Sequence, residues 1–234
     1  MKRGVLIKTG ILDYQFAWDW QRELHQQRVS GEIVDTLILT EHPHTYTIGK
    51  AGGEEHLIAD ERVLKQNGIT VYRIDRGGDI TYHGPGQIVG YPILDLHNYY
   101  LDVHRFLRDL EEVIIQTLAK YDIVADRVNG LTGVWVSGGK IAAIGVKVSR
   151  WVTMHGFAFN VNTDLSYFGN IVPCGISDKP VTSMARLLGT KVDYEAVKDM
   201  VARKFEDVFD LELIEDALVF EEASAGIRAI EFGE

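Results

Sequence analysis

Residues 129–184 read NGLTGVWVSGGKIAAIGVKVSRWVTMHGFAFNVNTDLSYFGNIVPCGISDKPVTSM, and the rest of the chain is organised around this stretch. Two runs rich in β-branched residues, 134–136 and 141–148, flank a Ser-Gly-Gly-Lys turn, a pattern that predicts a β-hairpin. A third apolar run at 155–161 predicts another strand. The only cysteine of the chain, Cys174, follows between a proline and a glycine, which predicts a loop.

Outside this stretch the hydrophobic periodicity predicts further strands and helices. The predicted strands are 4–7, 33–40, 69–74 and 88–94, and the predicted helices are 13–29, 60–66, 102–121, 180–188 and 193–209. Asp13 is a predicted N-cap and Gly68 a predicted C-terminal cap. Strands outnumber helices and do not alternate with them strictly. We therefore expect an α+β fold in which a central mixed β-sheet is flanked by helices, all on one side of it.

Nothing in the sequence divides the chain. It contains no internal repeat, low-complexity tract or linker, and the residues after 210 are informative only through their acidic charge. We expect a single catalytic domain over residues 1–234, with its motif-bearing core at about 30–210.

The composition limits the possible functions. The chain has 234 residues and a formal net charge of −10, which argues against non-specific nucleic-acid binding because Lys and Arg neutralise phosphates. No apolar run reaches membrane-spanning length, and the N-terminal residues lack the pattern of a signal peptide. A single cysteine cannot form an internal disulfide and indicates a reducing compartment. We expect a cytoplasmic protein that binds neither nucleic acid nor membrane.

Cys174 is a candidate nucleophile. A thiol attacks only as thiolate, and its ordinary pKa of about 8.5 calls for a nearby cation or base. His83 or His155 would supply the base of a Cys–His pair, whereas the ammonium of Lys140 would favour the thiolate directly. A helix that began near residue 181 would add its N-terminal dipole. The residues alone leave the choice open, and a buried structural cysteine and an exposed turn lysine are the plain alternatives.

Two features indicate a ligand site. The glycine-rich segment RGGDITYHGPGQ, residues 76–87, predicts a loop whose backbone approaches a ligand closely. It is no dinucleotide motif, since GxGxxG would need a glycine at Val89, and the phosphate-loop pattern fails around Lys140. Small residues in 142–145 and 156–158 would leave room for an apolar chain, although close sheet packing would explain them equally well.

Four segments, taken together, resemble a known family. They are RGGDITYHGPGQ (76–87), GGKIAAIG (138–145), MHGFAFNVNTDL (154–165) and PCGISDKPVTS (173–183). In this order they are similar to the lipoyl(octanoyl) transferases, the octanoyl-[acyl-carrier-protein]:protein N-octanoyltransferases of lipoate biosynthesis. The resemblance spans residues 40–184 and includes Cys174 and Lys140. Because the family belongs with the biotin and lipoate protein ligase catalytic domains, the resemblance implies an α+β fold with a central mixed sheet.

The resemblance also implies a mechanism and a site. Cys174 would carry octanoyl as a thioester, and Lys140 would lower the pKa of its thiol, which decides the open choice in favour of lysine. The implied substrate-binding residues are Arg76, Gly77, Gly78, Asp79, Ile80, Thr81, Tyr82, His83, Ala143, Ile144, Gly145, Gly156, Phe157 and Ala158. Since a thioester is already activated, no ATP, metal or redox cofactor is implied.

The implied partners are proteins. Octanoyl-acyl carrier protein would be the donor, and the apo lipoyl domains of 2-oxoacid dehydrogenase complexes and the glycine cleavage H protein would be the acceptors. Such partners are generally acidic, so the basic segment 140–150, with Arg76 and Arg186, is the expected docking surface. A solvated surface without a partner is the plain alternative.

Three other functions are compatible with parts of the sequence. An ATP-dependent lipoate–protein ligase would need a nucleotide site and no nucleophilic cysteine. A non-catalytic protein that binds the acyl carrier would form no covalent adduct. A hydrolase that used Cys174 with His83 or His155 would release free octanoate.

Overall fold

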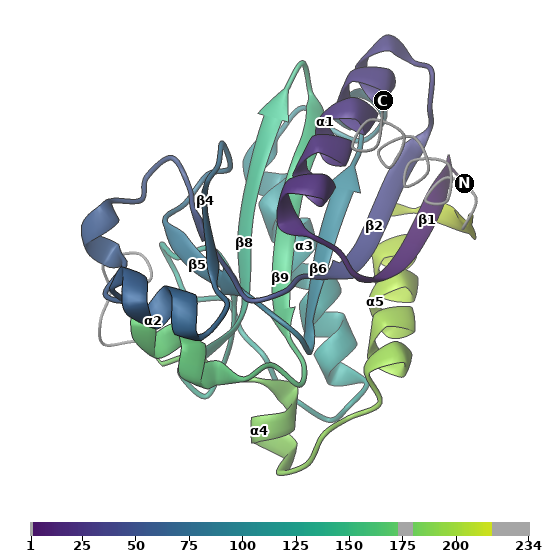
Figure 1. Cartoon of the computed structure of the whole chain (residues 1–234). Coiled ribbons are helices and arrows are strands. Elements are labelled where there is room, and N and C mark those ends of the chain that lie inside the picture. Colours follow the sequence, from purple (N-terminus) through teal and green to yellow (C-terminus); the bar gives the residue numbers. More distant parts are fainter. Residues whose placement is uncertain (1, 173–179, 217–234) are drawn as a thin grey trace, which may run out of the picture.

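The central sheet is mixed. In the computed structural model, which describes residues 2–172 and 180–216, seven strands form it. In spatial order they are β10 (Leu211–Glu215), β1 (Lys2–Ile11), β2 (Asp35–Glu41), β6 (Gln87–Ile93), β9 (Val152–Asn160), β8 (Gly139–Ser149) and β7 (Val134–Val136). β1 pairs in parallel with β2 and β10, and the other neighbours pair antiparallel. The predicted mixed sheet is confirmed (Figure 1). The antiparallel pairing of β7 with β8 confirms the predicted hairpin.

The long helices begin where the sequence predicts. They are α1 (Tyr14–Ser30), α3 (Val103–Ala119) and α5 (Tyr194–Phe209). The carboxylates of Asp13, Asp102 and Asp193 each accept a hydrogen bond from a backbone N–H of the first turn. This bond satisfies a donor that would otherwise have no partner within the helix, so each aspartate fixes a helix start.

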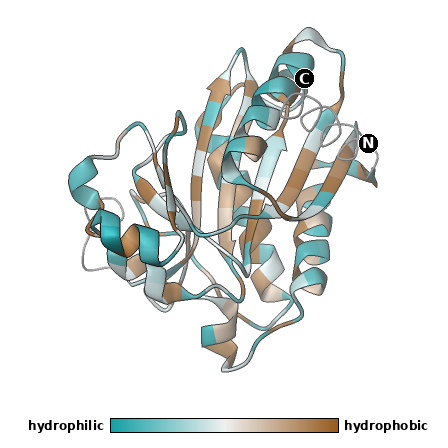
Figure 2. Ribbon diagram, viewed as in Figure 1, coloured by the Kyte–Doolittle hydropathy of each residue, from teal (hydrophilic) through white to brown (hydrophobic). Residues whose placement is uncertain are grey.

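Helices cover both faces of the central sheet, so the expectation of helices on one side is wrong (Figure 1). α1 packs on one face, and α3 and α5 pack on the other. Neighbouring strand residues point to opposite faces, and in β2 both sets are apolar. Ile38 joins the core cluster under α1, whereas Leu37 and Leu39 join the cluster under α3 and α5. Figure 2 shows these hydrophobic strands between helices that carry hydrophilic residues.

The described part of the chain also forms a small, three-stranded sheet with the order β4 (Thr70–Arg73), β3 (Thr45–Ile48), β5 (Ile80–His83). It adjoins the face covered by α1, where Tyr14 stacks on Tyr72 of β4. The segment predicted as a glycine-rich loop therefore contains β5, and β3 was not predicted. Strands of four residues bordered by glycine, proline and histidine are too short for a period of two to be recognised.

Smaller elements complete the chain. α2 (Glu61–Gln66) confirms the helix predicted at 60–66, with Asp60 as its N-cap. Its C-cap is Asn67, one residue before the predicted Gly68, which has a left-handed backbone with φ of 60°. The short helices η1 (Glu54–His56), η2 (Leu96–Asn98) and η3 (Leu165–Asn170) lie in connections. Among the described residues, no helix has the length and apolar character needed to cross a membrane.

Two predictions near the C-terminal end need correction. The helix predicted at 180–188 is only α4 (Met184–Leu188), capped by Ser183, and Val181 instead forms an isolated parallel bridge with Lys140. No helix N-terminus lies at residue 181. The segment 211–215, for which the sequence predicted nothing, is the edge strand β10.

Candidate active site

A cavity of about 460 Å³ lies where the glycine-rich segment meets β8 and β9. Its size is typical of a small-molecule site. The predicted residues that line it are Lys140, Arg76, Gly77, Gly78, Asp79, Ile80, Thr81, His83, Ala143, Ile144, Gly145, Gly156, Phe157 and Ala158. Three stretches that are distant in the sequence therefore meet around one space.

Tyr82 is the predicted substrate-binding residue that does not line the cavity. Its ring is buried in the core of the small sheet and stacks on Tyr167 at 5.1 Å between centroids. Its hydroxyl lies 2.8 Å from Nδ1 of His44. Tyr82 therefore holds η3 against the small sheet.

Lys140 lies in β8, where the sequence predicted the end of a turn. Its backbone N–H donates to Pro180 O, and its carbonyl accepts from the N–H of Thr182, both at 2.9 Å. Its ammonium lies 4.8 Å from the ring centroid of Trp135, within the range of a cation–π interaction. The side chain lines the cavity and is partly buried, so an exposed turn lysine does not describe it.

Cys174 lies outside the described residues, within 173–179. The residues on either side of that segment are held by hydrogen bonds. The N–H of Val172 donates to His56 O at 2.8 Å, and Pro180 O accepts from Lys140. The backbone six residues after Cys174 is thus bonded directly to the predicted catalytic lysine.

Arg76 supports the glycine-rich segment from inside. Its side chain is buried, and its Nη2 donates to both the carbonyl and the hydroxyl of Thr47, at 2.7 and 2.9 Å. A Cβ at Gly49 would lie only 2.8 Å from Nη1 of Arg76, so the glycine gives the guanidinium its space. The expectation that Arg76 belongs to an exposed docking surface is wrong.

The glycines of β8 and β9 have a packing role. A Cβ on Gly145 would lie 2.8 Å from Gly77 O, and a Cβ on Gly156 would lie 2.1 Å from Gly90 O. Close packing of backbone therefore explains these two glycines, the alternative that the sequence left open. The cavity instead gains space from the alanines Ala143 and Ala158, which pair across the β8–β9 ladder.

His83 is fully engaged by neighbours. Its Nδ1 lies 3.0 Å from Oε1 of Gln87, and its Nε2 lies 3.2 Å from the hydroxyl of Thr47. Because the amide oxygen only accepts, Nδ1 carries the proton and Nε2 accepts from the threonine. Burial lowers the pKa of His83 well below its ordinary value. These contacts describe a neutral histidine that fixes the glycine-rich segment.

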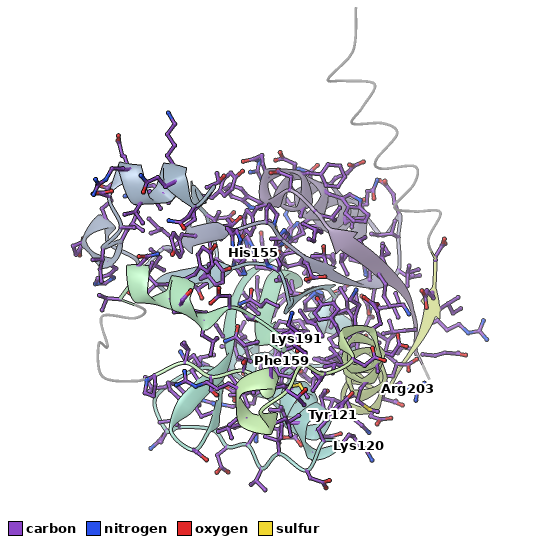
Figure 3. All side chains as sticks on the ribbon, turned by 60° about the horizontal axis from the view of Figure 1, so that its bottom comes forward. Lys120, Tyr121, His155, Phe159, Lys191 and Arg203 are labelled. Atoms are coloured by element: carbon purple, nitrogen blue, oxygen red, sulfur yellow. The ribbon has the colours of Figure 1, made fainter. Side chains whose placement is uncertain are left out.

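His155 stands at the other end of the cavity from Lys140. Its partner across the β8–β9 ladder is Val146, six residues beyond Lys140, which is roughly 20 Å along an extended strand. Its Nε2 lies 2.8 Å from Oδ1 of Asp75, and Lys147 Nζ lies 2.6 Å from Oδ2. Burial lowers the pKa of His155 although Asp75 opposes this effect. Figure 3 shows His155 well apart from Lys120 and Tyr121, which directly follow α3.

Asp79 connects the cavity wall to the chain that leads to Cys174. Its Oδ1 accepts from the N–H of Ile80 at 2.6 Å, and its Oδ2 lies 2.6 Å from Nδ1 of His56. The carboxylate raises the pKa of His56. The carbonyl of His56 accepts a hydrogen bond from the N–H of Val172. His56 therefore contacts both Asp79 in the cavity wall and the chain that leads to Cys174.

Several residues of the cavity wall were missed by the sequence reasoning. They are Tyr14, Gln87, Thr132, Trp135 and Asn160, among others. Gln87 and Asn160 are polar residues of the motifs quoted for the resemblance, and that signal could have identified them. Tyr14, Thr132 and Trp135 belong to apolar or loop segments where nothing distinguishes a wall residue from a core residue.

The family model and similar relatives among known proteins indicate the same family. Residues 13–206 match the model of the family described as the lipoyl protein ligase A/B catalytic domain. An octanoyltransferase of Cytophaga hutchinsonii is 49% identical over 231 residues, which cover 90% of this chain and 95% of the relative. An octanoyltransferase of Chloroflexus aggregans is 52% identical over 214 residues, which cover 90% and 97% of the two chains.

The solved structures that resemble this chain share its fold. A crystal structure of lipoate-protein ligase A bound with ATP matches with a TM-score of 0.79, covering 99% of this chain and 94% of that chain. The sequence identity of that pair is 18%, so the likeness concerns the fold alone.

Proposed function

We propose that this chain, which belongs to the lipoyl protein ligase A/B catalytic-domain family and to the octanoyltransferases within it, carries the octanoyl group as a thioester on Cys174. The donor is octanoyl-acyl carrier protein, and the acceptor is a lysine of an apo lipoyl domain. One catalytic domain over residues 1–234 performs both steps. The observation that carries the proposal is that Lys140 lines one cavity together with the three stretches expected to bind substrate.

The first step exchanges one thioester for another. The thiolate of Cys174 attacks the thioester carbonyl carbon of the donor. A bond forms between this carbon and Sγ of Cys174, the bond to the sulfur of the carrier breaks, and the carrier leaves as a thiolate. Because a thioester is broken and a thioester is formed, the step is close to energy balance. Its demand on the protein is a cysteine that is ionised at neutral pH.

Lys140 meets this demand in the proposal. An ammonium beside a thiol stabilises the thiolate and lowers the pKa of the thiol. Two features support the assignment. The lysine side chain reaches the cavity beside Trp135, and the backbone of Lys140 is bonded to residues 180 and 182, a few residues beyond Cys174.

The second step forms an amide. The neutral amine of the acceptor lysine attacks the thioester carbon and a C–N bond forms. The C–S bond to Cys174 breaks, the nitrogen releases one proton to solvent, and Lys140 again stabilises the departing thiolate. Backbone N–H groups near Gly175 or in the glycine-rich segment would bind the developing oxyanion. Gly77 is not one of them, because its N–H already donates to Val146 O at 2.9 Å.

Intact mass spectrometry after mixing with octanoyl-acyl carrier protein tests the thioester. We expect one octanoyl group on the wild-type chain and none on Cys174→Ala. Lysine modification that persists in Cys174→Ala and depends on ATP would support a ligase instead. Free octanoate without acceptor modification would support a hydrolase, and carrier binding without any adduct would support a non-catalytic binding protein.

Docking of the acidic partners is assigned to Arg150 and Arg186. Both are exposed, whereas the expected contributor Arg76 is buried and Lys147 is already paired with Asp75. Arg150→Glu should raise the KM for the carrier protein about twofold to fivefold at low ionic strength and leave kcat unchanged, since charge acts mainly on association. The effect should fade in salt. Equal KM values at low ionic strength would contradict the assignment.

A further inference from the structure

Glu111 is a fully buried carboxylate in the apolar stripe of α3. Its Oε1 accepts from the backbone N–H of Gly133 at 2.9 Å. Its Oε2 accepts from Arg108 at 2.7 Å and from Nε of Arg127 at 3.0 Å. A buried carboxylate is costly unless its oxygens are bonded, and here both are.

The partners of Glu111 stand at the two ends of one loop. Arg127 precedes residues 128–132 and Gly133 follows them, and Gly130, Leu131 and Thr132 of this loop line the cavity. A two-way backbone bridge between Asp126 and Trp135 closes the base of the same loop, with N–H to O distances of 2.8 and 2.9 Å. One carboxylate therefore ties both ends of a loop that forms part of the cavity wall.

Gly133 transmits this constraint to Lys140. Its φ is 131°, and a Cβ there would lie 2.7 Å from Ala142 O and 3.4 Å from Cε of Lys140. The backbone of Gly133 therefore borders one side of the lysine stem, while the ring of Trp135 lies under the ammonium. A displacement of Gly133 changes the space that the lysine side chain occupies.

We propose that Glu111 is a positioning residue: by holding Arg127 and Gly133 it fixes the loop 128–132 and, through it, the side chain of Lys140 in the cavity. The inference rests on the proposed function, in which the ammonium of Lys140 keeps Cys174 ionised. A helix glutamate with a purely structural role would contribute to stability and leave the ionisation of Cys174 unchanged.

The test compares Glu111→Gln with Glu112→Gln in the full chain. Glu112 also accepts from Arg127, at 2.6 Å, but no bond joins it to Gly133, which makes it the matched control. The measurement is the rate of Cys174 alkylation by iodoacetamide across pH, which follows the thiolate fraction. We expect Glu111→Gln to move the midpoint to higher pH and to slow alkylation at neutral pH about threefold to tenfold, since each pKa unit is a factor of ten. Glu112→Gln should keep the wild-type midpoint.

Two further variants decide the remaining cases. Arg127→Lys keeps the positive charge but loses the two hydrogen bonds that the guanidinium donates to Glu111 and Glu112. It should shift the midpoint in the same direction by less. If Glu111→Gln does not fold, this variant tests the positioning role in its place. Lys140→Ala separates this inference from the proposed function. If Lys140→Ala shifts the midpoint and neither Glu111→Gln nor Arg127→Lys does, the positioning role is refuted and the proposed function stands. If none of them shifts it, both are refuted. Equal shifts in Glu111→Gln and Glu112→Gln would also overturn the positioning role.

Discussion

The two ends of β8 each carry a lysine, and their surroundings differ. Lys147 lies 2.6 Å from Asp75, a carboxylate that also binds His155, so its charge is matched by a neighbour. Lys140 has an aromatic ring 4.8 Å from its ammonium and a glycine backbone beside its stem. The Asp75 carboxylate takes up much of the effect of the Lys147 charge on other groups, whereas the ammonium of Lys140 lies over an aromatic ring in the cavity wall, next to any group that the cavity holds. The neighbours of each lysine, and not the strand that carries it, therefore determine its role.

Exchange of each lysine for alanine gives the largest difference between the two ends. Lys140→Ala should slow single-turnover thioester formation on Cys174 about 10²–10³-fold, the loss typical of removing a group that activates a nucleophile. Its rate should also rise with pH toward the ordinary thiol pKa of about 8.5. Lys147→Ala should stay within about threefold of wild type. Similar losses in the two variants would remove the distinction.

A bulky residue between the two ends tests whether the octanoyl chain occupies the space there. Ala143→Leu should slow octanoyl transfer at least about tenfold by filling the cavity, since a single methylene group is worth about 1–3 kcal/mol in an apolar pocket. A butanoyl donor should be affected much less. Ile144→Leu, which keeps the volume at the adjacent position, is the control. If both donors slow equally, the chain does not extend past Ala143.

Removal of the carboxylate at the Lys147 end should affect stability and leave catalysis nearly unchanged. Asp75→Asn should lower the free energy of unfolding at pH 7 by about 1–2 kcal/mol, because two charged hydrogen bonds at a partly exposed site are lost. Asp199→Asn, on an exposed partner of Lys8, should cost less than about 0.5 kcal/mol. Urea unfolding measures both.

The pH dependence of that loss has a definite sign. The hydrogen bond from His155 and then the one from Lys147 hold the pKa of Asp75 below its ordinary value. A carboxyl with a depressed folded pKa contributes stability above its unfolded pKa of about 3.9 and loses it as the pH falls further. The wild type should therefore exceed Asp75→Asn in stability at pH 7, and the gap should narrow below about pH 4. A gap that persisted at low pH would contradict the assigned cause.

Local patterns predicted the helices and the site hairpin because their causes are local. An aspartate that caps a helix stands one residue before it, as Asp13 and Asp193 do. The turn at Ser137 and Gly138 lies between the strands β7 and β8 that it joins. By contrast, β3 and β5 pair with each other, and the four residues of each strand carry too little periodicity to identify it.

The family resemblance indicated which stretches carry the candidate site, but the sequence did not indicate how their polar groups are matched. All but one of the predicted substrate-binding residues line the cavity, because the quoted motifs group them by segment. The partner of His155 is Asp75, eighty positions away, and Glu111 binds Gly133 from within an apolar helix stripe. No spacing rule connects such residues, since the sheet topology brings them together.

Strand β10 has one more consequence. It pairs with residues 2–6 of β1 and so covers the outer edge of the central sheet beside the chain's first strand. A strand without that cover would offer a row of unsatisfied amide groups to any similar strand nearby. Chains shortened past Phe209 should therefore self-associate through β1 and precipitate while their cavity is still intact.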